Sequence, residues 1–120
     1  MRSPLLPALL AIGLALAAPC FAAGPNGGQT TVVDGHQFEF VATETGITVF
    51  VTEGDGRPID MAGASAKAFV QAEGKTQTLT LTPAAPNRLV ADLKAPLPAG
   101  AKIVLSAKMH GHTHQARFQK

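Results

Sequence analysis

The sequence predicts an all-β fold, namely an antiparallel immunoglobulin-like β-sandwich of seven to eight short strands. From Gln29 onward, apolar and polar residues alternate with a period of two, which is typical of half-buried strands. Turn-forming residues recur about every ten positions, as they do in β-sandwiches. No stretch shows the convincing 3.6-residue periodicity of an amphipathic helix.

Residues 1–23 have the pattern of a cleavable secretory signal peptide. An arginine follows the first methionine, the run Leu5–Ala18 is apolar, and Cys20 and Ala22 occupy the −3 and −1 positions of a cleavage site. The run of about 14 residues is shorter than the roughly 20 residues that a membrane-spanning helix needs. Lipidation of Cys20 is the alternative, but the proline beside it makes a poor lipobox. We therefore expect export to the periplasm.

Cleavage near Ala23 leaves about 97 residues, the size of a single domain. Residues 24–28 (Gly-Pro-Asn-Gly-Gly) cannot hold a regular element and are expected to form a flexible leader. Residues 29–120 are expected to form one β-sandwich domain. The only cysteine precedes the cleavage site and the chain has no Trp or Tyr. Disulfides, thiolate metal sites and the Cys, Trp and Tyr features of true immunoglobulin domains are therefore excluded from the mature chain.

The composition also argues against two classes of function. The formal charge is +2, falls to +1 without Arg2, and the basic residues are scattered singly along the chain. We therefore expect no binding to nucleic acid. The sequence offers no Ser/His/Asp arrangement, no phosphate-cradling glycine loop and no pair of catalytic carboxylates. We therefore do not expect an enzyme.

The first half of the domain is expected to contain three alternating strands, over residues 30–33, 36–42 and 47–52, with an Asp34-Gly35 turn between the first two. β-Branched and aromatic residues fill these strands, as a pleated, half-buried surface favours. In the second strand Phe38 and Phe40 share one face, while Gln37 and Glu39 share the other.

The second half is expected to begin with a hairpin around Glu73-Gly74-Lys75 and to continue with single strands, giving segments at 66–72, 76–82, 88–93, 101–108 and 114–119. The last two strands fix the position of the histidines. Their inward residues are Ile103, Leu105, Ala107, Ala116 and Phe118. Because directly opposed residues share a face, only a loop with an even number of residues keeps this set inside. A two-residue turn at His110-Gly111 satisfies the condition, since glycine and, less often, histidine tolerate positive φ.

This register predicts a metal site. Met109, His112 and His114 then share the inward face where the core meets solvent, and His110 sits at the tip and can swing in. His112 and His114 are roughly 6.5–7 Å apart along the strand, so their imidazoles can lean towards one ion. Imidazole suits copper, zinc and nickel, and a thioether adds a preference for Cu(I). We predict His112 and His114 as ligands of copper, alternatively zinc or nickel, with Met109 and His110 assisting.

The same residues fit a second interpretation, in which the histidines form a solvated turn and Met109 caps the core. The histidine cluster lacks the fixed spacing of zinc fingers or zincin helices. His36 is interpreted as a sheet-edge polar residue and Met61 as a core residue. One further loop lacks the pattern of a calcium site and is interpreted as a solvated turn; its acidic residues are Glu53, Asp55 and Asp60.

Strand and turn segments across the chain form a recognisable series: Pro25–Gln29, His36–Val41, Ile47–Thr52, Gly56–Ile59, Lys75–Leu81, Asn87–Leu89 and Gln115–Phe118. This series resembles small exported β-sandwich proteins and domains associated with periplasmic adaptor subunits of heavy-metal efflux systems. The resemblance implies a role in periplasmic handling of copper, zinc, cobalt or nickel, with a metal-efflux component as a partner. It implies no ligand set, because some members have a Pro-Gly-Gly-type turn in place of His110-Gly111-His112. The adaptors' helical hairpin and barrel segments are missing, so the chain is not itself a pump adaptor.

We therefore expect a periplasmic transition-metal-binding protein, for sequestration or delivery of copper. The alternative is a metal-free periplasmic interaction module that docks on a partner protein through a sheet edge or loops.

Overall fold

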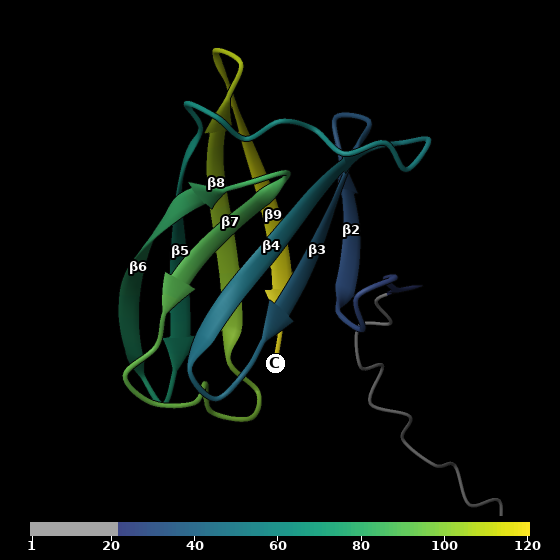
Figure 1. Cartoon of the computed structure of the whole chain (residues 1–120). Coiled ribbons are helices and arrows are strands. Elements are labelled where there is room, and N and C mark those ends of the chain that lie inside the picture. The colour runs from purple at the N-terminus through teal and green to yellow at the C-terminus, as the bar shows by residue number, and fades with distance from the viewer. Residues whose placement is uncertain (1–21) are drawn as a thin grey trace, which may run out of the picture.

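The computed structural model describes residues 22–120, so the expected signal peptide lies outside the described residues except for its last two positions (Figure 1). These residues form strands and no helix. The strands are β1 (Ala22–Ala23), β2 (Gln29–Val33), β3 (His36–Ala42), β4 (Gly46–Glu53), β5 (Ser65–Ala72), β6 (Lys75–Ala84), β7 (Arg88–Asp92), β8 (Lys102–Met109) and β9 (His112–Gln119). Within residues 22–120 there is accordingly no helix of the length and hydropathy that crossing a membrane requires.

Three of the hairpins use the same turn, which explains why their registers follow from sequence. The turns are Asp34-Gly35, Glu73-Gly74 and His110-Gly111, and both residues of each have φ between 51° and 80°. Positive φ at both central positions defines the type I′ turn, whose twist matches that of paired strands. Each turn is closed by the pair of residues that flanks it, for example Val33 with His36.

All strand pairs are antiparallel, and the strands form one curled sheet in the order β1-β2-β3-β4-β7-β6-β5-β8-β9. Strand β6 holds the sheet together, because residues 75–81 pair with β5 while Thr82–Ala84 pair with β7. The structure thus confirms an all-β antiparallel fold. The division into two separate sheets of an immunoglobulin-like sandwich stays a prediction.

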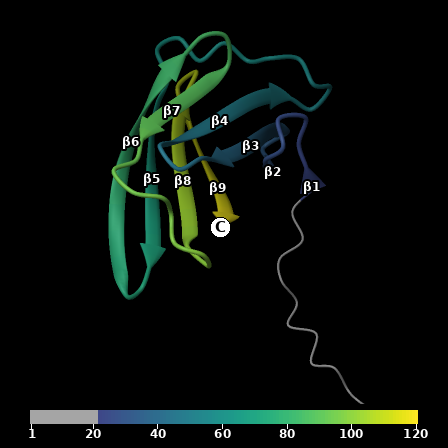
Figure 2. The same cartoon turned by 60° about the horizontal axis from the view of Figure 1, so that its bottom comes forward.

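The curl encloses one hydrophobic core. Figure 2 shows β3 and β4 crossing β8 and β9 at a steep angle, so that the inward faces of the two halves of the sheet meet. The largest fully buried side chains come from both halves and from the loop after β4: Phe38, Ile47, Val49, Val51, Met61, Leu81, Leu89, Ile103 and Leu105. Met61 therefore fills the core, as expected.

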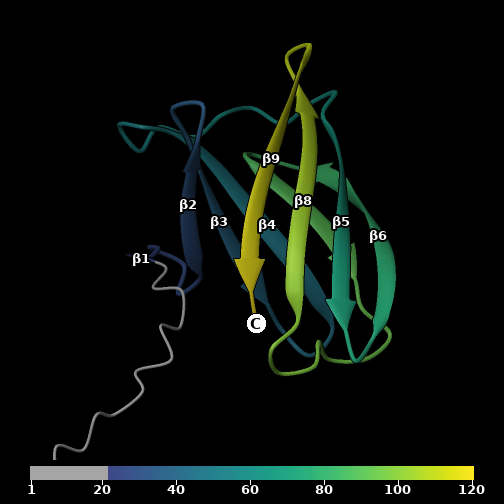
Figure 3. The same ribbon diagram turned by 180° about the vertical axis from the view of Figure 1, so that it is seen from behind.

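Strand β9 closes the curl by lying beside the β2–β3 hairpin (Figure 3). We call this contact the closing seam. Its upper end lies at the β2–β3 and β8–β9 turns, and its lower end lies near the C-terminus. At the lower end Phe40 and Phe118 stack with ring centroids 5.1 Å apart. The Gln29 side chain donates to the carbonyl of Gln119 and accepts a hydrogen bond from its N–H.

Residues 24–28 have no regular element, as expected, but they wrap around a buried carboxylate. Glu39 is only 3% exposed, on the outward side of β3. The N–H groups of Asn26 and Gly28 each donate to its Oε2 at 2.9 Å, and the Asn26 amide donates to Oε1 at 3.0 Å. A Cβ atom on Gly24 would lie 2.3 Å from the Glu39 carboxyl carbon, so only glycine fits there.

Candidate functional site

The β8–β9 hairpin has the register that the sequence predicts. Met109 pairs with His112, Ala107 with His114, and Ile103 with Phe118 across the two strands. The turn residue His110 has φ 51°, beside Gly111 at φ 80°. The side chains of Met109 and His114 therefore point inward with the core, as strand parity requires.

The four predicted ligands are divided between the core and the solvent. Met109 is 2% exposed and His114 is 8% exposed, whereas His110 and His112 at the hairpin tip are exposed. Within residues 22–120, no three side chains of the types His, Cys, Asp or Glu are already gathered to hold a metal ion. The register is thus confirmed, and the ligand set stays a prediction.

His114 lies against a second histidine across the closing seam. The ring centroids of His114 and His36 are 5.2 Å apart, with an interplanar angle of 82°. The ring of Phe38 lies 6.4 Å from that of His114, tilted by 46°, and gives His114 an apolar neighbour. The interpretation of His36 as a sheet-edge residue is wrong, because β3 pairs with β2 on one side and β4 on the other.

Asp34 orients the His114 ring. This residue belongs to the β2–β3 turn, and its Oδ2 atom lies 2.7 Å from Nδ1 of His114. A carboxylate can only accept, so Nδ1 donates to Asp34 and Nε2 is the nitrogen left for another partner. A carboxylate bound to the far nitrogen of a histidine is the usual second shell of a metal site, since it fixes the ring and raises the basicity of the ligand.

His36 repeats this arrangement more loosely. Its Nε2 atom lies 3.7 Å from Oε2 of Glu53, the residue paired with it on β4. Its Nδ1 atom is buried and has no hydrogen-bond partner among the residues that the structure describes. A buried polar atom without a partner is uncommon in folded proteins and requires an explanation. Each imidazole thus has a carboxylate near one nitrogen and a second nitrogen available for another partner.

The side chains at the upper end of the closing seam indicate which class of metal ion could bind there. Two imidazole nitrogens and a nearby buried thioether are donors that copper, zinc and nickel accept, with the thioether favouring Cu(I). Calcium and magnesium require several oxygen ligands instead. The residues present therefore fit a transition metal better than an alkaline-earth metal.

Sequence reasoning missed Asp34 and His36 as neighbours of His114, and Glu53 as the carboxylate near His36. Asp34 and His114 are separated by 80 positions, and periodicity carries no information about which distant strands become neighbours. The sequence did contain one weak signal that histidines from different hairpins could meet. His36 and His112 each follow directly on a two-residue turn, which places both at the turn ends of their hairpins.

The acidic loop after β4 behaves as a solvated turn. Asp55 accepts hydrogen bonds from the Arg57 side chain at 2.7 Å and from the Arg57 backbone at 3.1 Å. Asp60 accepts from the N–H of Ala62 at 2.9 Å. Asp55 and Asp60 are thus bonded within their own exposed loop, as expected of a solvated turn, whereas Glu53 ends β4 beside His36.

Comparison with known proteins gives no matching family model, no matching curated protein and no matching solved structure. The resemblance to proteins of heavy-metal efflux systems therefore stays a prediction, and the function has to be argued from the residues themselves.

Proposed function

We propose that this chain is a periplasmic transition-metal-binding protein that holds copper for sequestration or delivery. The observation that carries the proposal is the contact between His36 and His114, two imidazoles with centroids 5.2 Å apart, each near a carboxylate on one nitrogen. The buried, unpartnered Nδ1 atom of His36 would gain a partner when the ion binds.

Each residue has a distinct role in this proposal. His114 and His36 supply the imidazole nitrogens, and Met109 on the same inward face supplies a thioether. Asp34 and Glu53 hold the rings from behind, as carboxylates do in histidine metal sites. The exposed His110 and His112, which the sequence predicts as ligands, pass the ion between solvent and the buried pair.

Two wider parts of the proposal rest on the sequence. Export to the periplasm and a metal-efflux component as partner are supported by the signal-peptide pattern of residues 1–23 and by the family resemblance. An immunoglobulin-like sandwich is the finer fold class that we propose. It is supported by the two halves of the curled sheet, which pack on one core.

Metal titration of matched double variants tests the site. Purified protein is titrated with Cu(I), Cu(II) and Zn(II) beside His36→Ala/His114→Ala and His110→Ala/His112→Ala, and urea unfolding verifies that all three are folded. We expect the first variant to lose at least about 100-fold in copper affinity, because loss of a second-shell partner alone costs roughly 10–100-fold. The second variant should lose less, mainly in the rate of uptake. Acidification should release the metal, since protons compete for the same nitrogens.

Two results would contradict the proposed site. If only His110→Ala/His112→Ala abolishes binding, the ion is held at the solvated tip and not at the closing seam. If wild type and both variants bind metal with the same weak affinity, there is no site. The metal-free interaction module would then be the better function.

A further inference from the structure

The outer surface of β5, β6, β8 and β9 carries a regular pattern of cations. Strand registers arrange its outward side chains in rows that cross the strands. From the lower to the upper end, the rows are Thr76-Gln71-Lys102-Gln119, Thr78-Phe69-Val104-Arg117, Thr80-Lys67-Ser106-Gln115 and Ser65-Lys108-Thr113. We call this surface the basic face.

Each row of the basic face contains one basic residue, and none contains an acidic one. Successive rows are two residues apart, so they are spaced roughly 7 Å along the strands, and the four cations, which lie on β5, β8 and β9, span about 20 Å in that direction. All four basic side chains are exposed: Lys67, Lys102, Lys108 and Arg117. The eight acidic residues of the chain all lie elsewhere: Asp34, Glu39, Glu44, Glu53, Asp55, Asp60, Glu73 and Asp92. This placement gives a nearly neutral protein one cationic surface.

The remaining positions of the basic face are hydroxyl and amide side chains around two apolar ones, Phe69 and the half-buried Val104. Phe69 is 37% exposed and lies near the centre of the face, between Thr78 and Val104. The hydroxyl and amide side chains donate and accept hydrogen bonds without carrying charge. An exposed phenyl ring among them offers an apolar surface for one flat partner.

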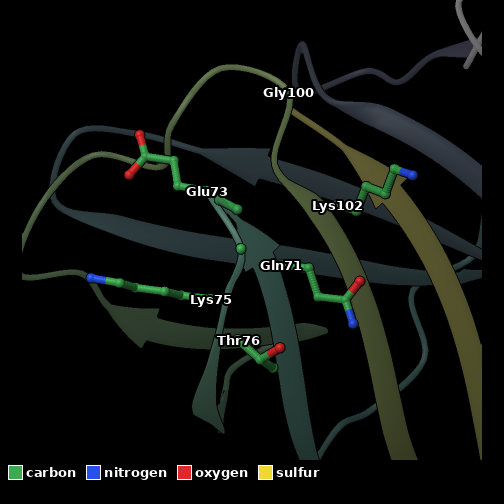
Figure 4. Close-up of a pocket in the computed structure, with 8 residues that line it drawn as sticks. Gln71, Glu73, Lys75, Thr76, Gly100 and Lys102 are labelled. Carbon is green, nitrogen blue, oxygen red and sulfur yellow. The ribbon is translucent and has the colours of Figure 1, made fainter.

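The basic face is hollowed at both ends. A hollow of about 280 Å³ near the upper end is lined by Lys67 and Lys108 together with Phe69 and the hydroxyls of Ser65, Thr80 and Thr113. A second hollow of about 430 Å³ lies at the lower end, next to the β5–β6 turn. It is lined by Gln71 and Lys102 on neighbouring strands and also by Glu73 of the turn, whose carboxylate is directed away from them (Figure 4). These volumes are close to the lower limit of ordinary small-ligand sites, roughly 300 Å³.

We propose that the basic face binds a linear acidic polysaccharide, a chain of sugars that carry carboxylate or sulfate groups. The cations, one in each row, pair with its charges, and the Ser, Thr and Gln side chains hydrogen-bond its hydroxyl groups. Phe69 packs on the apolar face of one sugar ring. This function is separate from the metal site, since the basic face is on the outside of the sheet and His114 is on the inside.

Two other polyanions fit the basic face less well. Proteins that bind single-stranded nucleic acid stack successive bases on several aromatic side chains, and this face has one. Anionic membranes are bound by basic amphipathic surfaces with a broad apolar side, and here Phe69 and Val104 are surrounded by hydroxyl and amide groups. Both polyanions serve as competitors in the test.

The test measures binding of oligogalacturonate and of heparin-derived oligosaccharide to the purified protein by calorimetry, with a metal chelator present. The variant Lys67→Glu/Arg117→Glu reverses two charges of the basic face, and Lys94→Glu/Lys120→Glu reverses two exposed charges elsewhere. We expect the first to bind about ten-fold more weakly, since each exposed ion pair contributes little, and the control to change less than about two-fold. Added salt should weaken binding to wild type.

Phe69→Ala separates the contribution of the ring from that of the charges, because it should weaken binding without changing the salt dependence.

His36→Ala/His114→Ala should bind the oligosaccharides like wild type. This variant therefore distinguishes a failure of the saccharide proposal from a failure of the proposed metal site. Absence of saccharide binding would overturn the proposal, as would an equal loss in both charge-reversed variants. Tighter binding of oligothymidylate or of anionic phospholipid vesicles at the same salt concentration would also overturn it.

Discussion

The two ends of the closing seam join the same strands with different chemistry. At the lower end, Phe40 stacks on Phe118, and the Gln29 side chain both donates to and accepts from the backbone of Gln119. At the upper end, His36 meets His114 edge to face, and the buried Nδ1 atom of His36 has no partner among the described residues.

The difference lies in how well each contact satisfies its polar groups. A stacked apolar pair with fully bonded neighbours is what packing and hydrogen bonding favour. An imidazole pair with an unpartnered nitrogen satisfies neither apolar packing nor hydrogen bonding fully. Such departures from ideal packing and bonding concentrate at functional sites. We therefore assign a structural role to the lower end and propose the binding role for the upper end.

The largest effect is expected from Phe118→Ala at the lower end. Removal of a buried phenyl ring leaves a cavity against Phe40, so the free energy of unfolding should fall by about 3–5 kcal/mol in urea denaturation. Phe69→Ala removes an equal ring from the exposed outer surface and should cost less than about 1 kcal/mol. Equal losses would show that the lower end does not hold β9 in place.

Glu39→Ala extends the comparison to a second fully bonded group. Three N–H donors from Asn26 and Gly28 would lose their acceptor, so stability should fall by about 2 kcal/mol. Glu44→Ala, in an exposed turn, is the matched control and should change stability by less than about 0.5 kcal/mol. If both variants unfold at the same urea concentration, residues 24–28 are not anchored by Glu39.

Gln29→Ala removes both hydrogen bonds between β2 and the end of β9. Each such bond contributes about 1 kcal/mol net, and water can reach this end of the seam, so the expected loss is about 1.5 kcal/mol. Amide hydrogen exchange should also speed up at Gln119, because its N–H loses its acceptor. Unchanged exchange at Gln119 would contradict the role of this contact.

His36→Phe should act in the opposite direction at the upper end. Replacing an imidazole that has an unpartnered buried nitrogen by an apolar ring should raise the free energy of unfolding by about 1 kcal/mol. The same variant should lose copper binding, whereas the exposed His112→Ala should leave stability within about 0.5 kcal/mol of wild type. A loss of stability in His36→Phe would make His36 a structural residue and remove the contrast between the two ends.

Much of the local structure could be predicted from the sequence. The segment 36–42 was expected as a strand and is β3, and the pairing of Met109 with His112 follows from the two-residue turn between them. These features depend on side-chain alternation and turn residues, which act over a few positions. The same reasoning placed His114 on the inward face, where it is found.

The neighbours of His114 could not be predicted in this way. Its contacts with Asp34 and His36 depend on the curl that brings β9 beside β2 and β3, and no local pattern encodes that approach. The exposure of His112 has a related cause. It shares the inward parity of His114, but it is the first residue after the turn, at the tip of the hairpin, which projects above the neighbouring strands (Figure 1).

The closing seam also determines when the candidate site can form. Its contacts join residues 80 and 90 positions apart in the chain, so their formation requires closure of nearly the longest loops available. Chains dominated by such distant contacts fold slowly, over milliseconds to seconds. Because the imidazole pair joins β9, the last of the described strands in chain order, to β3, it forms only when the curl has closed. Metal capture would therefore report that the whole domain has finished folding.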